Sequence, residues 1–153
     1  MNVETNSLYY LLKEVFLLLD DGDRRLFGAY ELTQARFYAL FHLGEQPGIS
    51  SSRLSELMFC DKSNITRLIK GLESDGLVVR RPHETDGRSL RLYLTPEGEN
   101  LGQKVLRAHH DYNAERLNCC LTFEDQNGLY EWLVTLRNGL EQQLYESEVL
   151  PVA

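Results

Sequence analysis

The spacing of apolar residues predicts that the chain begins with an amphipathic helix. Six aliphatic residues recur at intervals of three and four, and Tyr9 and Phe16 widen the face that they form. This face is wider than the edge of one small domain requires. The acidic run 20–23 that follows either ends the helix or forms its solvated side. The six aliphatic residues are Leu8, Leu11, Leu12, Val15, Leu18 and Leu19.

Three shorter helices are predicted between residues 33 and 76, each with a suitable N-cap residue. The caps are Thr33, Ser50 and Asp61. The helix after Asp61 has apolar residues at i, i+3, i+4 and i+7 and is expected to end near Gly76. Its inward-facing residues are Ile65, Leu68, Ile69 and Leu72.

The periodicity then becomes two, which predicts a β-hairpin. Segments 77–81 and 90–94 are the expected strands, and the polar loop 82–89 joins them. Thr95 caps a long helix that runs from Pro96 to about residue 119. Thr122 and Asp125 form a capping box for a last helix. The apolar stripe of that helix is Leu129, Trp132, Leu133, Leu136, Leu140 and Leu144.

This order of elements predicts a mainly α fold with a small β wing. Two short helices followed by a hairpin are typical of a winged helix-turn-helix, here over residues 33–96. The outer segments 1–32 and 97–147 carry more apolar surface than the centre needs and are expected to form a helical dimerisation region. The 153 residues form a single such chain.

The charge distribution singles out the same central segment. The net charge is −7, yet residues 61–94 hold 7 Lys and Arg against 5 Asp and Glu. The segments before and after it are both acidic, with 5 against 8 and 4 against 10. A local basic face matters more for phosphate binding than the total charge does.

The helix that follows Asp61 is the candidate for DNA recognition. Its outer face presents Ser63, Asn64, Arg67 and Lys70 near the N-terminal half. Arg67 can pair with guanine and Asn64 with adenine, whereas Ser63, Thr66 and Lys70 suit phosphate or mixed contacts. The alternative is that any surface helix shows some polar and basic residues.

The hairpin favours the DNA interpretation. Arg88 lies at its tip, and Asp86 is spaced to brace the guanidinium in a narrow minor groove. The flanking strands carry three more arginines, Arg80, Arg81 and Arg91, some of which could reach backbone phosphates. The alternative is a solvated turn with an incidental Asp–Arg ion pair. This interpretation is the weaker one, because the hairpin follows a positively charged helix in an otherwise acidic chain.

Together these motifs resemble the MarR-type transcriptional regulators, most closely from residue 33 to residue 98. The resemblance implies a homodimer on a pseudo-palindromic operator of double-stranded DNA, with the wing arginine in the minor groove. It also implies release by a small-molecule effector, an oxidant or a metal, and repression more than activation. Phe59 and Gly71 depart from the family pattern. The matching segments are Leu54-Ser55-Glu56-Leu57-Met58, Ser63-Asn64-Ile65-Thr66-Arg67-Leu68-Ile69, Gly76-Leu77-Val78, Arg80-Arg81-Pro82, Asp86-Gly87-Arg88 and Leu92-Tyr93-Leu94-Thr95-Pro96-Glu97-Gly98.

Several residues suggest a sensor. His42, with Phe37, Phe41 and Tyr9, is a candidate lining of a ligand pocket, and a core histidine is the simpler interpretation. Cys60, Cys119 and Cys120 are more readily explained by packing than by redox sensing, because an unactivated thiol has a pKa near 8.5. His109 and His110 point about 100° apart on a helix, so the sequence predicts no metal site and no cofactor.

Other function classes find little support in the sequence. It lacks a Gly-rich phosphate loop, a nucleophile elbow and a metal-ligand motif, so an enzyme is not expected. It shows no apolar run of membrane-spanning length and no signal peptide, and its three cysteines suit a cytoplasmic protein. The alternative function is a winged-helix module that binds proteins and has no use for Arg67, Lys70 and Arg88.

Overall fold

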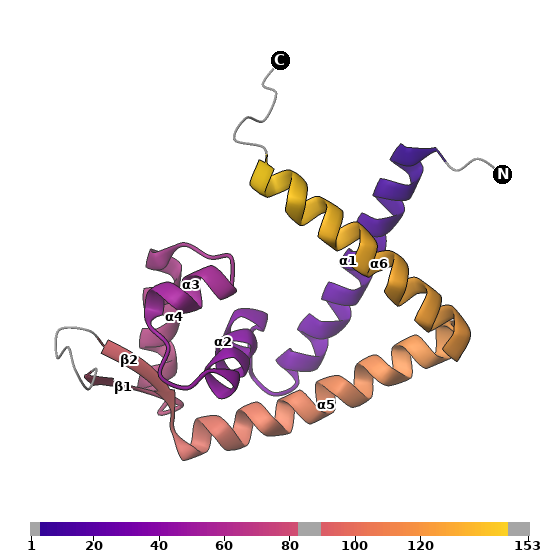
Figure 1. Cartoon of the computed structure of the whole chain (residues 1–153). Helices are drawn as coiled ribbons and strands as arrows, with labels where there is room; N and C mark the ends of the chain where they lie inside the picture. Colours follow the sequence, from indigo (N-terminus) through magenta and orange to yellow (C-terminus); the bar gives the residue numbers. More distant parts are fainter. Residues whose placement is uncertain (1–3, 83–89, 147–153) are drawn as a thin grey trace. The chain divides into compact units, whose positions relative to one another are not determined.

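The computed structural model describes residues 4–82 and 90–146, with the side chains of the last two residues of that range left out. The chain divides into two compact units, Met1–His109 and His110–Ala153. The observed order of elements confirms the mainly α fold with a two-stranded wing (Figure 1). The elements are α1 (Thr5–Gly28), α2 (Gln34–Glu45), α3 (Ser51–Leu57), α4 (Lys62–Ser74), β1 (Val78–Pro82), β2 (Leu90–Leu94), α5 (Pro96–Cys120) and α6 (Phe123–Glu146).

Local capping chemistry sets the ends of the short helices. The Thr33 hydroxyl accepts a hydrogen bond from the Arg36 amide at 3.2 Å, and the Ser50 hydroxyl accepts one from the Arg53 amide at 3.1 Å. Asp61 occupies the N-cap of α4 without a side-chain cap bond. Gly76 ends α4 with a φ of 71°, as its predicted C′ position requires.

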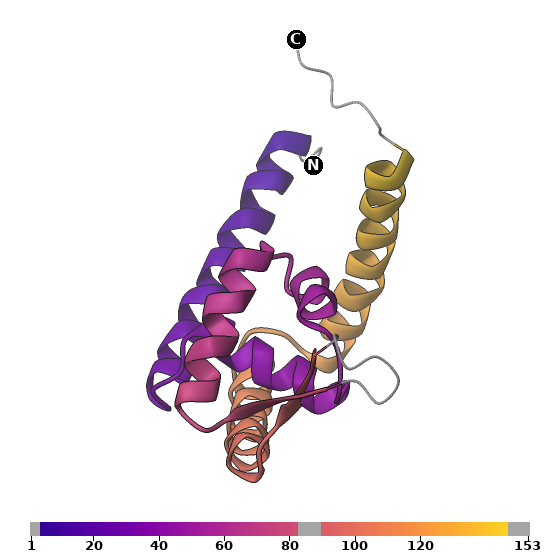
Figure 2. The same cartoon turned by 90° about the vertical axis from the view of Figure 1, so that its left-hand side faces the viewer.

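The core lies inside the first unit, where α2, α3 and α4 gather beside the β1–β2 hairpin (Figure 2). The face predicted for α4 is confirmed, since Ile65, Ile69 and Leu72 are buried and Leu68 packs against them. Phe27 from α1 stacks on Phe37 with ring centroids 4.2 Å apart. Burial of this apolar surface is what holds the short helices together.

The two strands of the predicted hairpin pair antiparallel, with Val78 opposite Leu94 and Arg80 opposite Leu92. Ile49 forms a further bridge to Leu92, which ties the loop before α3 to the wing. The predicted wing-tip residues Asp86 and Arg88 lie outside the described residues.

Helix α1 continues through the acidic run 20–23, which resolves the alternative left open by the sequence. Asp21 forms ion pairs with Arg24 and Arg25 one turn later, at 2.9 and 2.7 Å. The Asp23 carboxylate lies 3.3 Å from His109 Nε2 on α5. These interactions favour the helical conformation within the acidic run.

The start of α5 is fitted tightly to the hairpin. The Thr95 amide donates to the Leu77 carbonyl at 3.0 Å, and the Thr95 hydroxyl donates to the Gly76 carbonyl at 2.6 Å. A methyl group at Gly98 would lie 2.0 Å from the Leu77 carbonyl oxygen. Only glycine can therefore occupy position 98 without moving the backbone.

The second unit contains the end of α5 and all of α6. The predicted capping box is confirmed: the Thr122 hydroxyl accepts from the Asp125 amide, and the Asp125 carboxylate accepts from the Thr122 amide, both at 3.2 Å. Along α6 as far as Leu144, the apolar stripe is exposed. In the part of the chain that the structure describes, no helix is long and apolar enough to cross a membrane.

Candidate nucleic-acid interface and adjoining pocket

The outer face of α4 is polar, basic and accessible. All of its predicted contact residues are exposed, so the structure brings them together on one surface. Arg67 Nη2 donates to Asn64 Oδ1 at 2.6 Å, and the Thr66 hydroxyl donates to the Lys62 carbonyl at 2.8 Å. The exposed set is Ser63, Asn64, Thr66, Arg67 and Lys70.

Two ion pairs fix the C-terminal end of α4 to the rest of the unit. Arg36 of α2 pairs with Asp75 at the helix C-cap. Arg80 of β1 pairs with Glu73, with Arg80 Nε 3.1 Å from Glu73 Oε2. Arg80 thus holds the end of the helix to the wing. The sequence does not indicate this ion pair, because the two residues lie on different elements.

The remaining strand arginines differ in exposure. Arg81 is exposed, and its guanidinium lies 5.1 Å from the centre of the Tyr93 ring. Arg91 is half-buried and donates to the Gly48 carbonyl at 3.4 Å. Of the arginines in the described part of the wing, Arg81 is therefore the one best placed for an external partner.

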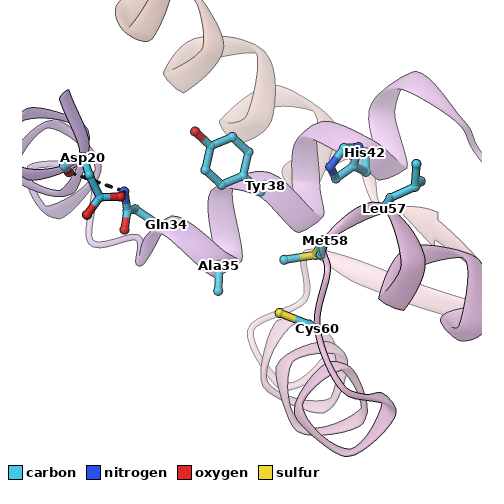
Figure 3. Close-up of a pocket in the computed structure, with 8 residues that line it drawn as sticks. All are labelled: Asp20, Gln34, Ala35, Tyr38, His42, Leu57, Met58 and Cys60. Atoms are coloured by element: carbon cyan, nitrogen blue, oxygen red, sulfur yellow. Dashed lines mark hydrogen bonds between the residues drawn. The ribbon is translucent and has the colours of Figure 1, made fainter. Parts of the chain in front are cut away.

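An open pocket of about 400 Å³ adjoins the turn that precedes α4 (Figure 3). Gln34 Nε2 donates to Asp20 Oδ1 at 2.8 Å on one side of it. Met58 and Cys60 flank the other side, with their sulfur atoms directed toward the side of Ala35. The lining comes from α1, α2 and the α3–α4 region: Asp20, Gln34, Ala35, Tyr38, His42, Leu57, Met58 and Cys60.

Of the four residues proposed for ligand binding, His42 lines this pocket. Phe37 is 2% exposed and forms part of the core, where it stacks on Phe27. Phe41 packs near Phe37 and His42, while Tyr9 is exposed on α1, and neither is among the lining residues. Tyr38 and Gln34 also line the pocket, although the sequence does not predict it. Helical spacing alone does not show which element packs against each face of α2.

Burial tunes two titratable groups of the pocket. It lowers the pKa of His42, so the imidazole is neutral at pH 7. Burial, and then the negative charges of Asp23 and Asp20, raise the pKa of Tyr38, which keeps the phenol protonated. The pocket therefore offers a neutral imidazole and a phenolic hydroxyl beside apolar side chains.

The three cysteines differ in how far they are buried. Cys60 is half-buried against the core, as expected, and the Ser55 hydroxyl donates to its carbonyl. Cys119 and Cys120 are exposed in the single chain, so this chain alone does not supply the packing expected for them. They lie at the last turn of α5, where their Sγ atoms are 3.6 Å apart. Among the described residues, no cluster of His, Cys, Asp and Glu can hold a metal ion.

The sequence of this chain is similar to those of known proteins. The model of the MarR family matches residues 30–89. The transcriptional regulator PecS of Dickeya dadantii is 31% identical over 112 residues, which cover 71% of this chain and 68% of PecS. The regulator TtmR of Methylorubrum extorquens is 28% identical over 85% of this chain, and the chain spans 65% of the TtmR length.

Solved structures show the same fold. A MarR family protein from Bacillus stearothermophilus superimposes with a TM-score of 0.79 at 26% identity, covering 92% of this chain and 99% of that one. A mutant of MarR from E. coli, complexed with operator DNA, gives a TM-score of 0.74 at 23% identity, covering 84% and 92%. The winged segment, the related sequences and the shared fold place this chain in the MarR family, as a DNA-binding transcriptional regulator and not an enzyme.

Proposed function

We propose that the protein is a cytoplasmic homodimeric repressor that binds a pseudo-palindromic operator and releases it when a small molecule binds. The observation that carries the proposal is the exposed basic face of α4, held at one end by Arg36–Asp75 and Arg80–Glu73. A major groove about 12 Å wide admits one helix, whose first turns reach the base edges. The solved MarR from E. coli, which shares the fold, is bound to operator DNA in its structure.

Within this proposal, Arg67 and Asn64 recognise bases, and Ser63, Thr66 and Lys70 contact phosphates. Arg67 and Asn64 bond to each other at 2.6 Å in the free chain. Both side chains would exchange that bond for base edges on binding, so neither is left without a partner in either state. Arg81 would contact the backbone, and Asp86 would brace Arg88 in the minor groove.

The dimer would be built from segments 1–32 and 97–147, while residues 33–96 bind DNA. The support is apolar surface that a single chain leaves exposed on α1 and α6, including Leu18 and Leu133. Exposed apolar surface of this extent is typical of an interface. Two copies would present two α4 helices to half-sites about 34 Å apart.

The effector would be a small, largely apolar molecule with a hydrogen-bonding group, such as a phenol. Ala35, Leu57 and Met58 supply apolar contacts in the pocket, and His42 and Tyr38 supply neutral polar ones. Because Leu57, Met58 and Cys60 belong to the segment that leads into α4, occupancy of the pocket would shift the start of that helix. A shift of this kind would weaken DNA binding.

The test is a fluorescence-anisotropy titration of the full-length protein with an operator duplex, selected by the wild-type protein from a random-sequence library. Arg67→Ala should weaken operator binding by about 1–3 kcal/mol and relax specificity at one base step. Lys70→Ala should weaken operator and scrambled duplex alike and reduce the salt dependence. Equal losses on both duplexes for Arg67→Ala would overturn its base-recognition role. Titrating the complex with phenols then tests release.

A further inference from the structure

Phe59 is the most exposed large apolar residue in the described chain. Its side chain is 98% accessible, although it lies between Met58 and Cys60, which both pack against the core. It is part of the short connection from α3 to α4, two residues before the N-cap Asp61. An aromatic ring in this position contributes nothing to the packing of the winged-helix unit.

The backbone of Phe59 also adopts a conformation that glycine favours. Its φ is 50°, in the left-handed region. The Phe59 amide donates to the Glu56 carbonyl at 3.2 Å, and the Cys60 amide donates to the Ser55 carbonyl at 3.1 Å. These bonds form a Schellman motif that ends α3, with Phe59 at the position where Gly is usual.

Phe59 therefore disfavours the folded state, because the left-handed conformation is strained for a bulky residue. Its ring offsets none of this strain, because it is as exposed in the folded chain as in the unfolded one. Glycine at position 59 would keep both hydrogen bonds of the motif and relieve the strain. An observed outlier of this kind points to a role outside the fold.

The position of the turn identifies the partner. In helix-turn-helix proteins the first helix crosses the DNA backbone, and the N-terminal residues of the second contact base edges. The connection between the two helices thus lies at the rim of the major groove. Phe59 precedes Ser63 and Asn64 by only a few residues, and all three residues are exposed.

We propose that Phe59 is a further DNA-contacting residue, whose ring packs against apolar groups at the rim of the major groove. Two such groups are available there, the 5-methyl group of thymine and the carbon atoms of deoxyribose. The contact with a thymine methyl group would add specificity at one position, whereas the sugar contact would add affinity on any sequence. The inference rests on the proposed role of α4 as the recognition helix.

The experiment compares three full-length variants on the selected operator duplex. Phe59→Gly should raise the melting temperature, because it removes the strain, yet weaken operator binding by about tenfold. Phe59→Ala should weaken binding to a similar extent while leaving the left-handed strain in place. Phe59→Leu keeps an apolar side chain and should retain most of the affinity. Opposite changes in stability and affinity are a result that a purely structural role would not give.

The source of the contact is found by replacing each thymine of a half-site with uracil, which lacks the 5-methyl group. If one replacement weakens the wild-type protein but not Phe59→Ala, the ring contacts that methyl group. If Phe59→Ala weakens binding to operator and scrambled duplex without such coupling, the ring contacts deoxyribose. Wild-type affinity in both Phe59→Ala and Phe59→Gly would overturn the inference. Failure of Arg67→Ala to weaken binding would instead overturn the proposed role of α4.

Discussion

Helices α4 and α6 both carry an apolar stripe at helical spacing, but the stripe of α4 is buried and that of α6 is exposed. In α4, Ile65, Ile69 and Leu72 are fully enclosed by the rest of the unit. In α6, Leu133 and Leu136 remain 43% and 41% exposed, although the periodicity is as regular. Periodicity therefore predicts that a helix has an apolar face but not which surface covers it.

The contrast separates a region that completes its own core from one that does not. In the first unit, the winged-helix segment closes around Phe37, Leu40 and Leu54 together with Phe27 of α1 and Val105 of α5. The exposed stripe of α6 resembles half of an interface, in keeping with the proposed homodimer. Charges placed on the two regions should accordingly have different consequences.

The largest effect is expected from Leu133→Glu combined with Leu136→Glu. Each protomer would then have to bury two carboxylates at the proposed interface, four in the dimer, so the protein should become monomeric. Because each monomer carries one α4, operator affinity should fall by more than about 100-fold. Light scattering and anisotropy measure the two changes.

The matched control is Asn127→Glu combined with Asn138→Glu, which adds the same charge to the opposite face of α6. That variant should keep both the dimer and the affinity. If the leucine variant stayed dimeric with unchanged operator binding, α6 would not be the interface.

A smaller effect, on stability, is expected from Gly98→Ala in the self-sufficient region. The added methyl group would lie 2.0 Å from the Leu77 carbonyl oxygen, which the backbone can relieve only by moving. Unfolding free energy should fall at the upper end of the roughly 1–3 kcal/mol seen for overpacking. Gly71→Ala, where nothing lies within 4 Å, should instead stabilise by about 1 kcal/mol. Chemical denaturation measures the unfolding free energy of both variants. Equal changes in the two variants would contradict this prediction.

The smallest effect concerns pH and His42. Its pKa is lowered by burial, so the unfolded chain takes up a proton before the folded one as the pH falls. Stability should therefore decrease as the pH drops through 6.5, the ordinary value for histidine, and the loss should end below the lowered pKa. Melting curves of wild type and His42→Gln should diverge in this range. Parallel curves would show that His42 does not titrate with folding.

The sequence predicted best what depends on a few neighbouring residues. The caps at Thr33 and Ser50, the left-handed Gly76 and the Thr122–Asp125 box each require only local hydrogen bonds, and all of them are present. The order of helices and strands follows from the same signals combined with hydrophobic period.

Features that depend on distant partners were not accessible from the sequence. The continuation of α1 through its acidic run involves His109, which is far along the chain. The burial of Phe37 depends on Phe27, and the pairing of Arg80 with Glu73 depends on how β1 leaves α4. The left-handed Phe59 contradicts local preference, so no propensity rule predicts it.

The tight seat of Gly98 has a consequence for where the chain can change length. Gly98, Gly102, Val105 and His109 lie on one face of α5 and meet, in turn, the Leu77 backbone, Leu40, the core and the rings of Phe27 and Phe37. Inserting or deleting one residue among them would turn everything beyond it by about 100° around the helix axis. The contact between the wing and Gly98 thus fixes which face of α5 points toward the core. An insertion or deletion between Gly98 and His109 is incompatible with these contacts.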